Sequence, residues 1–442
     1  MKCGFARKDI TPGFPVPMAG YQANRISRGV HDRLYVRALY FEGAEEGPAV
    51  ILQADLLGLD RVCLEKIYGA LNGDFPGAAL NVPLPRLDKN KLLVCAVHTH
   101  SGFGGIYDTE NGINRELIPL LGESSPALVD LVVRACVEAV AEAAGNCAET
   151  TVRINRGTVK GLGANRRRAG IPCDTSLFTV EFHRLDRKRI LLYNLCCHPT
   201  VLNAENLLLS ADFPGAVAEK LEESPGAYDM VAFINGSAGD MSTRFTRRES
   251  GFAECERFAT IVIDALESTC KGEFLPLEKI ELRYHPFSLL LTKTPDYEEA
   301  KANLQKALQN LTDMKNQNAD PASLRKAESL VEGAQIGVIK SRSRESTANG
   351  SPCGSPPAGK TIEAGILRIN TTTVVCSPFE LFSSLALTLK EKKNVECFGY
   401  VNNLEGYLAD CDAWDNLDYE ALFGYFARGE GERYIELVSA LL

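Results

Sequence analysis

Short apolar segments alternate with amphipathic segments along the first two thirds of the chain, and this alternation constrains the fold more than any other feature. The apolar runs are typical of buried strands, and the stretches that follow them carry apolar residues at helical spacing. The expected strands are 34–42, 49–55, 92–97, 151–156, 177–183, 190–197 and 230–234, and the expected helices are 60–71, 126–144, 214–222 and 252–269. Strands that alternate with helices predict an α/β fold, here a layered mixed β-sheet flanked by helices, with a site where the strands end.

The last third of the chain has a different pattern. Residues 296–341 are rich in Ala, Lys, Gln, Glu and Leu, with an interruption at 318–321, and this composition predicts a helical pair. We interpret it as an insertion or lid arm within one fold. Residues 347–360 are a loop by composition, and strands are expected at 362–369 and 371–377, with a helix after Pro378. Because no linker interrupts the pattern, we expect residues 1–442 to form a single domain.

Charge and cysteine usage exclude several classes of protein. Acidic residues outnumber basic ones by 57 to 48, which argues against binding to nucleic acid or to an anionic membrane. The first residues lack the pattern of a secretory signal, and no apolar run is long enough to cross a bilayer. The 14 cysteines are scattered without CxxC pairs, which favours reduced, buried thiols. We therefore expect a cytoplasmic protein with no stable membrane association.

Three of the six histidines directly follow expected buried strands. His98 and His100 follow one strand in the segment HTHSGFGG, and His198 follows another in the segment HPT. Residues two apart in a strand face the same side, so His98 and His100 can address one cleft. Imidazole is the usual protein ligand of zinc. A single histidine here would be interpreted as a hydrogen-bonded core residue, but two such motifs favour a metal site.

A third polar cluster follows the expected strand 230–234. Its small residues let the backbone approach a ligand, and Asp240 could orient a histidine. Arg244 and Arg247 could pair with a carboxylate or phosphate on a substrate. The alternative, a helix cap at Ser242 or Thr243 with surface arginines, explains the segment equally well.

In order along the chain, these and other short segments resemble the neutral/alkaline (non-lysosomal) ceramidase family, in particular its N-terminal catalytic domain. The matching segments are DITP at 9–12, MAGY at 18–21, GVHDRL at 29–34, AD at 54–55, HTHSG at 98–102, GG at 104–105, NR at 165–166, HPT at 198–200, AGD at 238–240, PFE at 378–380, GYVN at 399–402, Tyr407 and YE at 419–420. HTHSG is the most specific of them. The resemblance covers nearly the whole chain, so we expect one ceramidase-like catalytic domain over 1–442 with the insertion 296–341 inside it.

The resemblance also implies a set of site residues. One zinc ion per chain is expected on four side chains: His98, His198, Glu380 and Tyr407. The resemblance also implies that His100, Arg166 and Tyr419 contact the substrate amide. With Asp240 from the third polar cluster they form the expected catalytic group, and the expected substrate-binding group is Gly102, Asn165, Arg244 and Arg247. Zinc would activate a water for attack on a carbonyl, with His100 as the general acid. Composition alone would not select Glu380 or Tyr407, and a serine nucleophile at Ser250 has only a weak match.

Two departures bear on the substrate. The family's Asn-Arg-Ser is Asn165-Arg166-Arg167 here, and extra arginines suit a polar or anionic molecule. The chain also ends about 20 residues after Tyr419, so we expect a short, bacterial-type homologue without the family's C-terminal β-sandwich. The resulting hypothesis is a zinc-dependent hydrolase that cleaves an amide or ester bond in a soluble small molecule. The alternatives are a true ceramidase acting on N-acyl sphingosine and a non-catalytic ligand-binding homologue; a homo-oligomer is left open.

Overall fold

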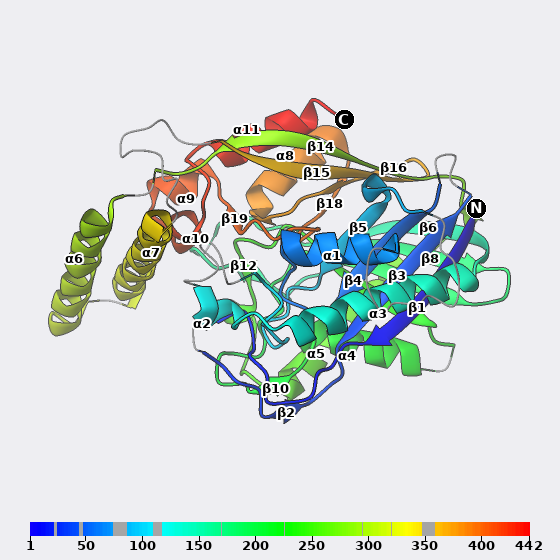
Figure 1. Cartoon of the computed structure of the whole chain (residues 1–442), viewed down its shortest axis with the longest axis horizontal. Helices are drawn as coiled ribbons and strands as arrows, with labels where there is room; N and C mark the ends of the chain where they lie inside the picture. The colour runs from blue at the N-terminus through cyan, green and yellow to red at the C-terminus, as the bar shows by residue number, and fades with distance from the viewer. Residues whose placement is uncertain are drawn as a thin grey trace.

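The computed structural model describes residues 1–442 except 22–23, 44–46, 74–85, 109–116, 169, 225, 294, 320 and 347–358. Two sheets lie face to face with helices outside them, and a helical pair projects at one end (Figure 1). This layered mixed α/β architecture confirms the predicted fold class.

The larger sheet is mixed, with parallel pairs at both edges. Its main strands are, in spatial order, β11 (Met230–Asn235), β9 (Arg189–Leu195), β8 (Ser176–Arg184), β6 (Ala148–Thr158), β1 (Lys2–Asp9), β3 (Tyr35–Glu42), β4 (Ala49–Ala54) and β5 (Leu92–Ala96). The edge pairs β11–β9 and β4–β5 are parallel, and the pairs between them are antiparallel. The edge strands are almost entirely buried, because protein covers both of their faces.

Alternate residues of these strands face two different cores. One face packs on helices α1 (Arg61–Leu71), α3 (Pro126–Gly145), α4 (Asp212–Glu223) and α5 (Phe252–Thr269). Helix α1 has an ordinary side-chain cap: Asp60 accepts the amide of Cys63 at 2.8 Å at its start. The predicted helices and strands of this part are present, with boundaries that shift by a few residues.

The other face of the large sheet packs on a second sheet. Its strands are β14 (Ile280–Leu290), β15 (Gly359–Ile369), β16 (Thr372–Cys376) and β18 (Glu396–Phe398). Phe41 and Phe182 of the large sheet lie in one core with Leu367 and Phe398 of the small sheet. Helices α8 (Ser383–Lys393) and α11 (Glu430–Ser439) cover the outer face of the small sheet. The result is four layers in the order helix, sheet, sheet, helix.

The predicted helical pair is formed by α6 (Tyr297–Asn316) and α7 (Pro321–Ser346). Asp296 caps α6, and only Ala300 of that helix is buried. Helix α7 packs on the short helix α10 (Tyr419–Phe423), which ties the projecting pair to the body of the protein (Figure 1). A loop was predicted at 347–360. Residues 347–358 lie outside the described residues, and residues 359 and 360 begin β15.

Two expectations about the chain as a whole can be compared with the structure. In the ranges described above, no helix is both long enough and apolar enough to cross a bilayer. Each cysteine in those ranges is free, and most of them are buried, as expected for reduced thiols.

Candidate active site

The loops that carry the predicted histidines meet at one end of the large sheet. The sheet curls until its two edge strands, β5 and β11, come together. Asn235, the last residue of β11, donates from Nδ2 to the carbonyl of Val97 at 3.2 Å and to that of Cys197 at 3.0 Å. Those residues directly precede His98 and His198, so one side chain joins the two histidine loops.

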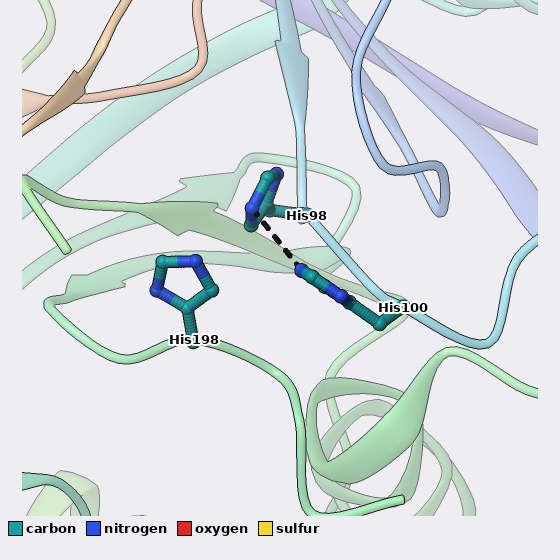
Figure 2. A group of neighbouring side chains, drawn as sticks. All are labelled: His98, His100 and His198. Carbon is teal, nitrogen blue, oxygen red and sulfur yellow. Dashed lines mark hydrogen bonds between the residues drawn. The ribbon is translucent and has the colours of Figure 1, made fainter. Parts of the chain in front are cut away.

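The imidazoles of His98, His100 and His198 are turned toward one another (Figure 2). Their candidate ligand nitrogens all lie within 4.8 Å of one another, and Nε2 of His100 is 3.4 Å from Nε2 of His98. Glu380 completes the cluster, with Oε2 3.3 Å from Nε2 of His98 and 3.2 Å from Nε2 of His198. Two ligand atoms that are each about 2.1 Å from a tetrahedral zinc ion are about 3.4 Å apart, so these separations fit a metal centre.

Main-chain carbonyls orient two of the imidazoles. Nδ1 of His98 donates to the carbonyl of Leu57 at 2.7 Å, and Nδ1 of His198 donates to that of Ala238 at 2.8 Å. A carbonyl can only accept, so the proton is on Nδ1 and the lone pair of Nε2 faces the cluster. His98 also has a φ of 69°, in the left-handed region that few residues other than glycine adopt.

The electrostatics of the cluster favour the protonation states that a metal needs. Burial and the neighbouring histidines hold the pKa of His100 well below its ordinary value, while burial and Arg166 lower the pKa of His198 to about 4. Burial by itself raises the pKa of Glu380, but the charges and hydrogen bonds of His98 and His198 outweigh it and bring that pKa well below its ordinary value. At neutral pH these two imidazoles are neutral and the carboxylate is ionised.

Glu380 and Tyr407 lie side by side because two very short strands pair. Strand β17 (Glu380–Leu381) is parallel to β19 (Tyr407–Leu408), with Glu380 opposite Tyr407. Arg166 donates from Nη2 to the hydroxyl of Tyr407 at 2.9 Å and from Nε to Glu420 at 2.5 Å. Tyr419, next to Glu420 on α10, has its ring 6.2 Å from that of Tyr407. The structure therefore brings Arg166, Tyr407 and Tyr419 together beside Glu380.

Asp240 has a different contact from the one expected. Its carboxylate accepts from Asn165 at 2.8 Å and from the amide and hydroxyl of Ser383 at 2.7 and 3.0 Å. The carbonyl of Ala238, two residues earlier, is the group that orients His198. Asp240 and Asn165 thus join the loop of Arg166 to the start of α8, and burial raises the pKa of Asp240 to about 6.

Arg244 and Arg247 do not line the cavity beside the histidines. Arg244 is exposed in a short 3₁₀ helix (Thr243–Phe245), whose first turn is capped by the hydroxyl of Ser242. Arg247 donates to the carbonyls of Thr200 and Val201. These contacts fit the alternative of a capped turn with surface arginines and correct the expectation that the two arginines reach a substrate anion.

Gly102 and Ser250 also have structural contacts. Gly102 is buried, and its carbonyl accepts the amide of Ala19 at 3.2 Å. The hydroxyl of Ser250 donates to the carbonyl of Val201 at 2.7 Å and accepts the amide of Asn203 at 2.8 Å. Neither residue lines the cavity.

A cavity of about 710 Å³ ends at the cluster. The predicted site residues that line it are His98, His100, Glu380, Tyr407 and Tyr419, and its apolar wall contains Leu57, Leu117, Leu120, Leu121 and Phe423. Six acidic residues line it, Asp60, Glu65, Asp108, Glu363, Glu380 and Glu405, against three basic ones, Arg61, Lys89 and Lys360. The described lining is therefore net negative.

Two residues that hydrogen-bond to the histidine loops were not predicted. The buried guanidinium of Arg25 donates from Nη2 to the carbonyls of Ala19 and His100, at 2.5 and 2.6 Å. Because its partners are main-chain atoms, no motif marks Arg25. Asn235 had a weak signal, since a polar residue at the end of a buried strand is typical of a site. Gly20 was part of a quoted motif; a Cβ there would come within 2.6 Å of the His100 ring.

Comparisons with known proteins agree on one family. A family model described as "Neutral/alkaline non-lysosomal ceramidase, N-terminal" matches residues 1–280. Neutral ceramidase from Drosophila melanogaster is 23% identical over 273 residues, which cover 54% of this chain and 36% of that protein. Neutral ceramidase from Pseudomonas aeruginosa (strain PAO1) is 28% identical over 141 residues, which cover 31% of this chain and 20% of that protein. The matches thus span about a third or less of the length of these relatives.

Solved structures show the same fold over nearly the whole chain. The crystal structure of neutral ceramidase from Pseudomonas aeruginosa superposes with a TM-score of 0.71 at 18% identity, covering 99% of this chain and 73% of that one. A structure described as a ceramidase complexed with C2 has a TM-score of 0.72 at 16% identity, and the superposition covers 99% of this chain and 74% of that one.

Proposed function

The chain belongs to the neutral/alkaline non-lysosomal ceramidase family, and from that premise we propose that it is a zinc-dependent hydrolase that cleaves an amide bond in an N-acylated small molecule. One observation carries the proposal. His98, His198 and Glu380 come from three distant segments of the chain, yet Oε2 of Glu380 lies 3.3 and 3.2 Å from the Nε2 atoms of the two histidines, the spacing of ligands on a tetrahedral ion, at the end of a cavity.

The donor atoms fit zinc better than a hard cation. Imidazole nitrogens with one carboxylate oxygen are the ligand set of catalytic zinc sites, whereas magnesium and calcium prefer oxygen ligands. His98, His198, Glu380 and Tyr407 would hold one ion per chain, with His100 on the substrate side. When bound, zinc supplies a Lewis acid and lowers the pKa of water to about 7.

The protein's own groups have separate tasks around the substrate. Nδ1 of His100 has no hydrogen-bond partner among the described residues, so this ring can take and return a proton at the leaving nitrogen. Arg166 holds the hydroxyl of Tyr407 toward the site. Tyr419 lines the cavity and supplies a hydroxyl to the polar part of the substrate. A positioned donor of this kind is typically worth about 3 kcal/mol in the transition state.

The cavity favours a neutral substrate over an anionic one. The arginines that motivated an anionic substrate do not line it, and the lining is net negative. A neutral N-acyl amide is the substrate class that we propose, with an ester as a poorer analogue. The apolar wall beside the cluster, which includes Leu120, Leu121 and Phe423, would also take an alkyl chain, so N-acyl sphingosine is the second candidate.

The test combines metal content with a substrate panel. We expect one equivalent of zinc in the purified protein, lost in His98→Ala and retained in the control His285→Ala, because His285 lies on β14 away from the cluster. Short-chain N-acyl amides, the matching esters and a fluorescent ceramide would be compared under the same conditions. Zinc retention in His98→Ala would remove the proposed metal site, and preference for ceramide would replace the first substrate class with the second.

A non-catalytic binding protein is the remaining alternative. It would take up zinc or a ligand without turnover of any amide or ester in the panel. We also propose a cytoplasmic setting, since the buried free cysteines suit a reducing compartment.

A further inference from the structure

The side chain of Asn235 is fully buried and binds main-chain atoms of two different loops. Its Nδ2 donates to the carbonyl of Val97 and to the carbonyl of Cys197, and its Oδ1 accepts the amide of Cys197 at 3.4 Å. An amide is well suited to this place among the polar side chains of its size, because it supplies two donors and an acceptor at once.

These bonds matter because the sheet does not pair the two histidine strands directly. His98 follows β5 and His198 follows β9, and in the order of the sheet the two strands are separated by β8, β6, β1, β3 and β4. No ladder hydrogen bond between β5 and β9 therefore sets the distance between the loops. Within the described residues, a hydrogen bond from the amide of His100 to the carbonyl of Pro199 also links the loops, and at 3.4 Å it is long.

The carbonyls of Leu57 and Ala238 set how each ring is turned, but each of them acts on one histidine alone. We infer that Asn235 is a positioning residue for metal binding, whose amide sets the separation of the His98 and His198 loops. The inference rests on the proposed zinc site and deepens it, because it names a residue that touches neither metal nor substrate.

Removing the amide would have two separable effects. The carbonyls of Val97 and Cys197 would lose a buried donor, which lowers the melting temperature of the metal-free protein. The two loops would also lose their common partner, so the separation of the Nε2 atoms would no longer be fixed before the metal binds. Loss of a group that supports metal ligands typically weakens metal affinity about 10–100-fold.

A matched control distinguishes these effects. Asn194 on β9 is also buried, and its Nδ2 donates to a single main-chain carbonyl, that of Ile234, at 2.9 Å. Asn194→Ala therefore removes a similar buried amide bond without touching either histidine loop. Zinc affinity of Asn235→Ala, Asn194→Ala and wild type would be measured by chelator competition. Cobalt(II) absorption would report the coordination geometry, and metal-free melting would report stability.

We expect both variants to melt at similar, lower temperatures. Only Asn235→Ala should bind zinc about 10–100-fold more weakly and change the cobalt(II) spectrum. Equal zinc affinity in the two variants, whether both are unchanged or both are weakened, overturns the inference. If Asn235→Ala does not fold, Asn235→Ser keeps one small donor and takes its place; wild-type zinc affinity and spectrum in that variant also overturn it.

Failure of the proposed function has a different signature. A wild-type protein that binds no zinc removes the metal site and this inference with it. Zinc that is bound by wild type, lost in His98→Ala and held equally well by Asn235→Ala and Asn194→Ala leaves the proposed function standing and removes the inference alone.

Discussion

The two halves of the site are held in place by different kinds of partner. In the histidine half, His98 and His198 each bind a main-chain carbonyl, and Asn235 joins their loops through main-chain atoms. In the arginine half, Arg166 is held largely by side chains, those of Tyr407 and Glu420, with one further bond to the carbonyl of Gly239. Main-chain partners survive most substitutions nearby, whereas side-chain partners are lost with the residue. We therefore expect a substitution in the histidine half to disturb one ligand only, and a substitution in the arginine half to displace several side chains together.

The largest effect is expected from a ligand of the histidine half. His198→Ala should abolish stoichiometric zinc binding and lower turnover by about three orders of magnitude, the equivalent of about 4 kcal/mol. His98 should keep its orientation, because its partner is the carbonyl of Leu57. Zinc content, turnover and the imidazole NMR signal of His98 would be measured. If His198→Ala shifts the His98 signal as far as unfolding does, the two histidines are not oriented independently of each other.

In the arginine half, Glu420→Gln removes the buried carboxylate that neutralises the guanidinium of Arg166, whose side chain is 14% exposed. Loss of one partner of a buried pair destabilises a fold by about 3 kcal/mol, and we expect Arg166 and Tyr407 to be displaced together. Turnover should fall about 10–100-fold while zinc stays bound, the equivalent of about 1.4–2.7 kcal/mol.

The control for this variant is Asp415→Asn, whose carboxylate accepts from Nε of Arg428 at 2.8 Å in a pair that is exposed on both sides, at 58% and 56%. An exposed pair of this kind contributes little to stability, so the control should unfold almost as wild type does. Stability would be measured by urea unfolding. An equal loss in the two variants would show that the contacts of Arg166 do not act as a connected network.

Asp240 joins the halves, and its expected signature is a pH dependence. Burial raises its pKa to about 6 from an ordinary 3.8, so between those values the folded protein holds a proton that the unfolded chain has released. The stability from this proton is complete below the lower value and is lost as pH rises through about 6. Asn resembles the protonated carboxyl, so the advantage of wild type over Asp240→Asn in unfolding free energy should shrink as pH rises across this window. A constant difference would count against the raised pKa.

The smallest effect is expected at Ser250. Its hydroxyl bridges Val201 and Asn203 on the surface side of the histidine loop and does not line the cavity. Ser250→Ala should therefore change turnover less than about twofold and stability by about 1 kcal/mol. A loss of turnover comparable with that of His198→Ala would make Ser250 a nucleophile and shift catalysis away from the histidine half.

The sequence predicted the histidine half better than the arginine half for a physical reason. His98 and His198 each follow an apolar strand by a few residues, so local pattern places them at the edge where strand ends meet. Glu380 and Tyr407 meet through two-residue strands whose paired residues are 27 positions apart, and such a pairing leaves no periodic signal. Only the resemblance to a family indicated them.

Arg167 shows the same limit. As an extra arginine it was expected to suit a polar or anionic substrate, yet the side chain is 1% exposed and pairs with Asp410, Asp412 and Asp418 from the end of the chain. Strands β1 and β14 were missed because both carry charged residues, and β14 also contains Pro286. These two segments form strands because they pair with neighbouring strands, and their own composition does not favour a strand.

The projecting helical pair has a practical consequence for anyone who would shorten this protein. Helix α10 has five residues, too few to hold its own shape, and α7 supports it: a Cβ at Gly333 would press on Leu422, and Lys340 donates to the carbonyl of Gly424. Deleting the arm to obtain a smaller protein would remove the contacts that support α10, which carries Tyr419 and Glu420. A shortened protein that keeps the part of the cavity lining formed by α10 therefore has to keep α7 or replace its contacts with α10.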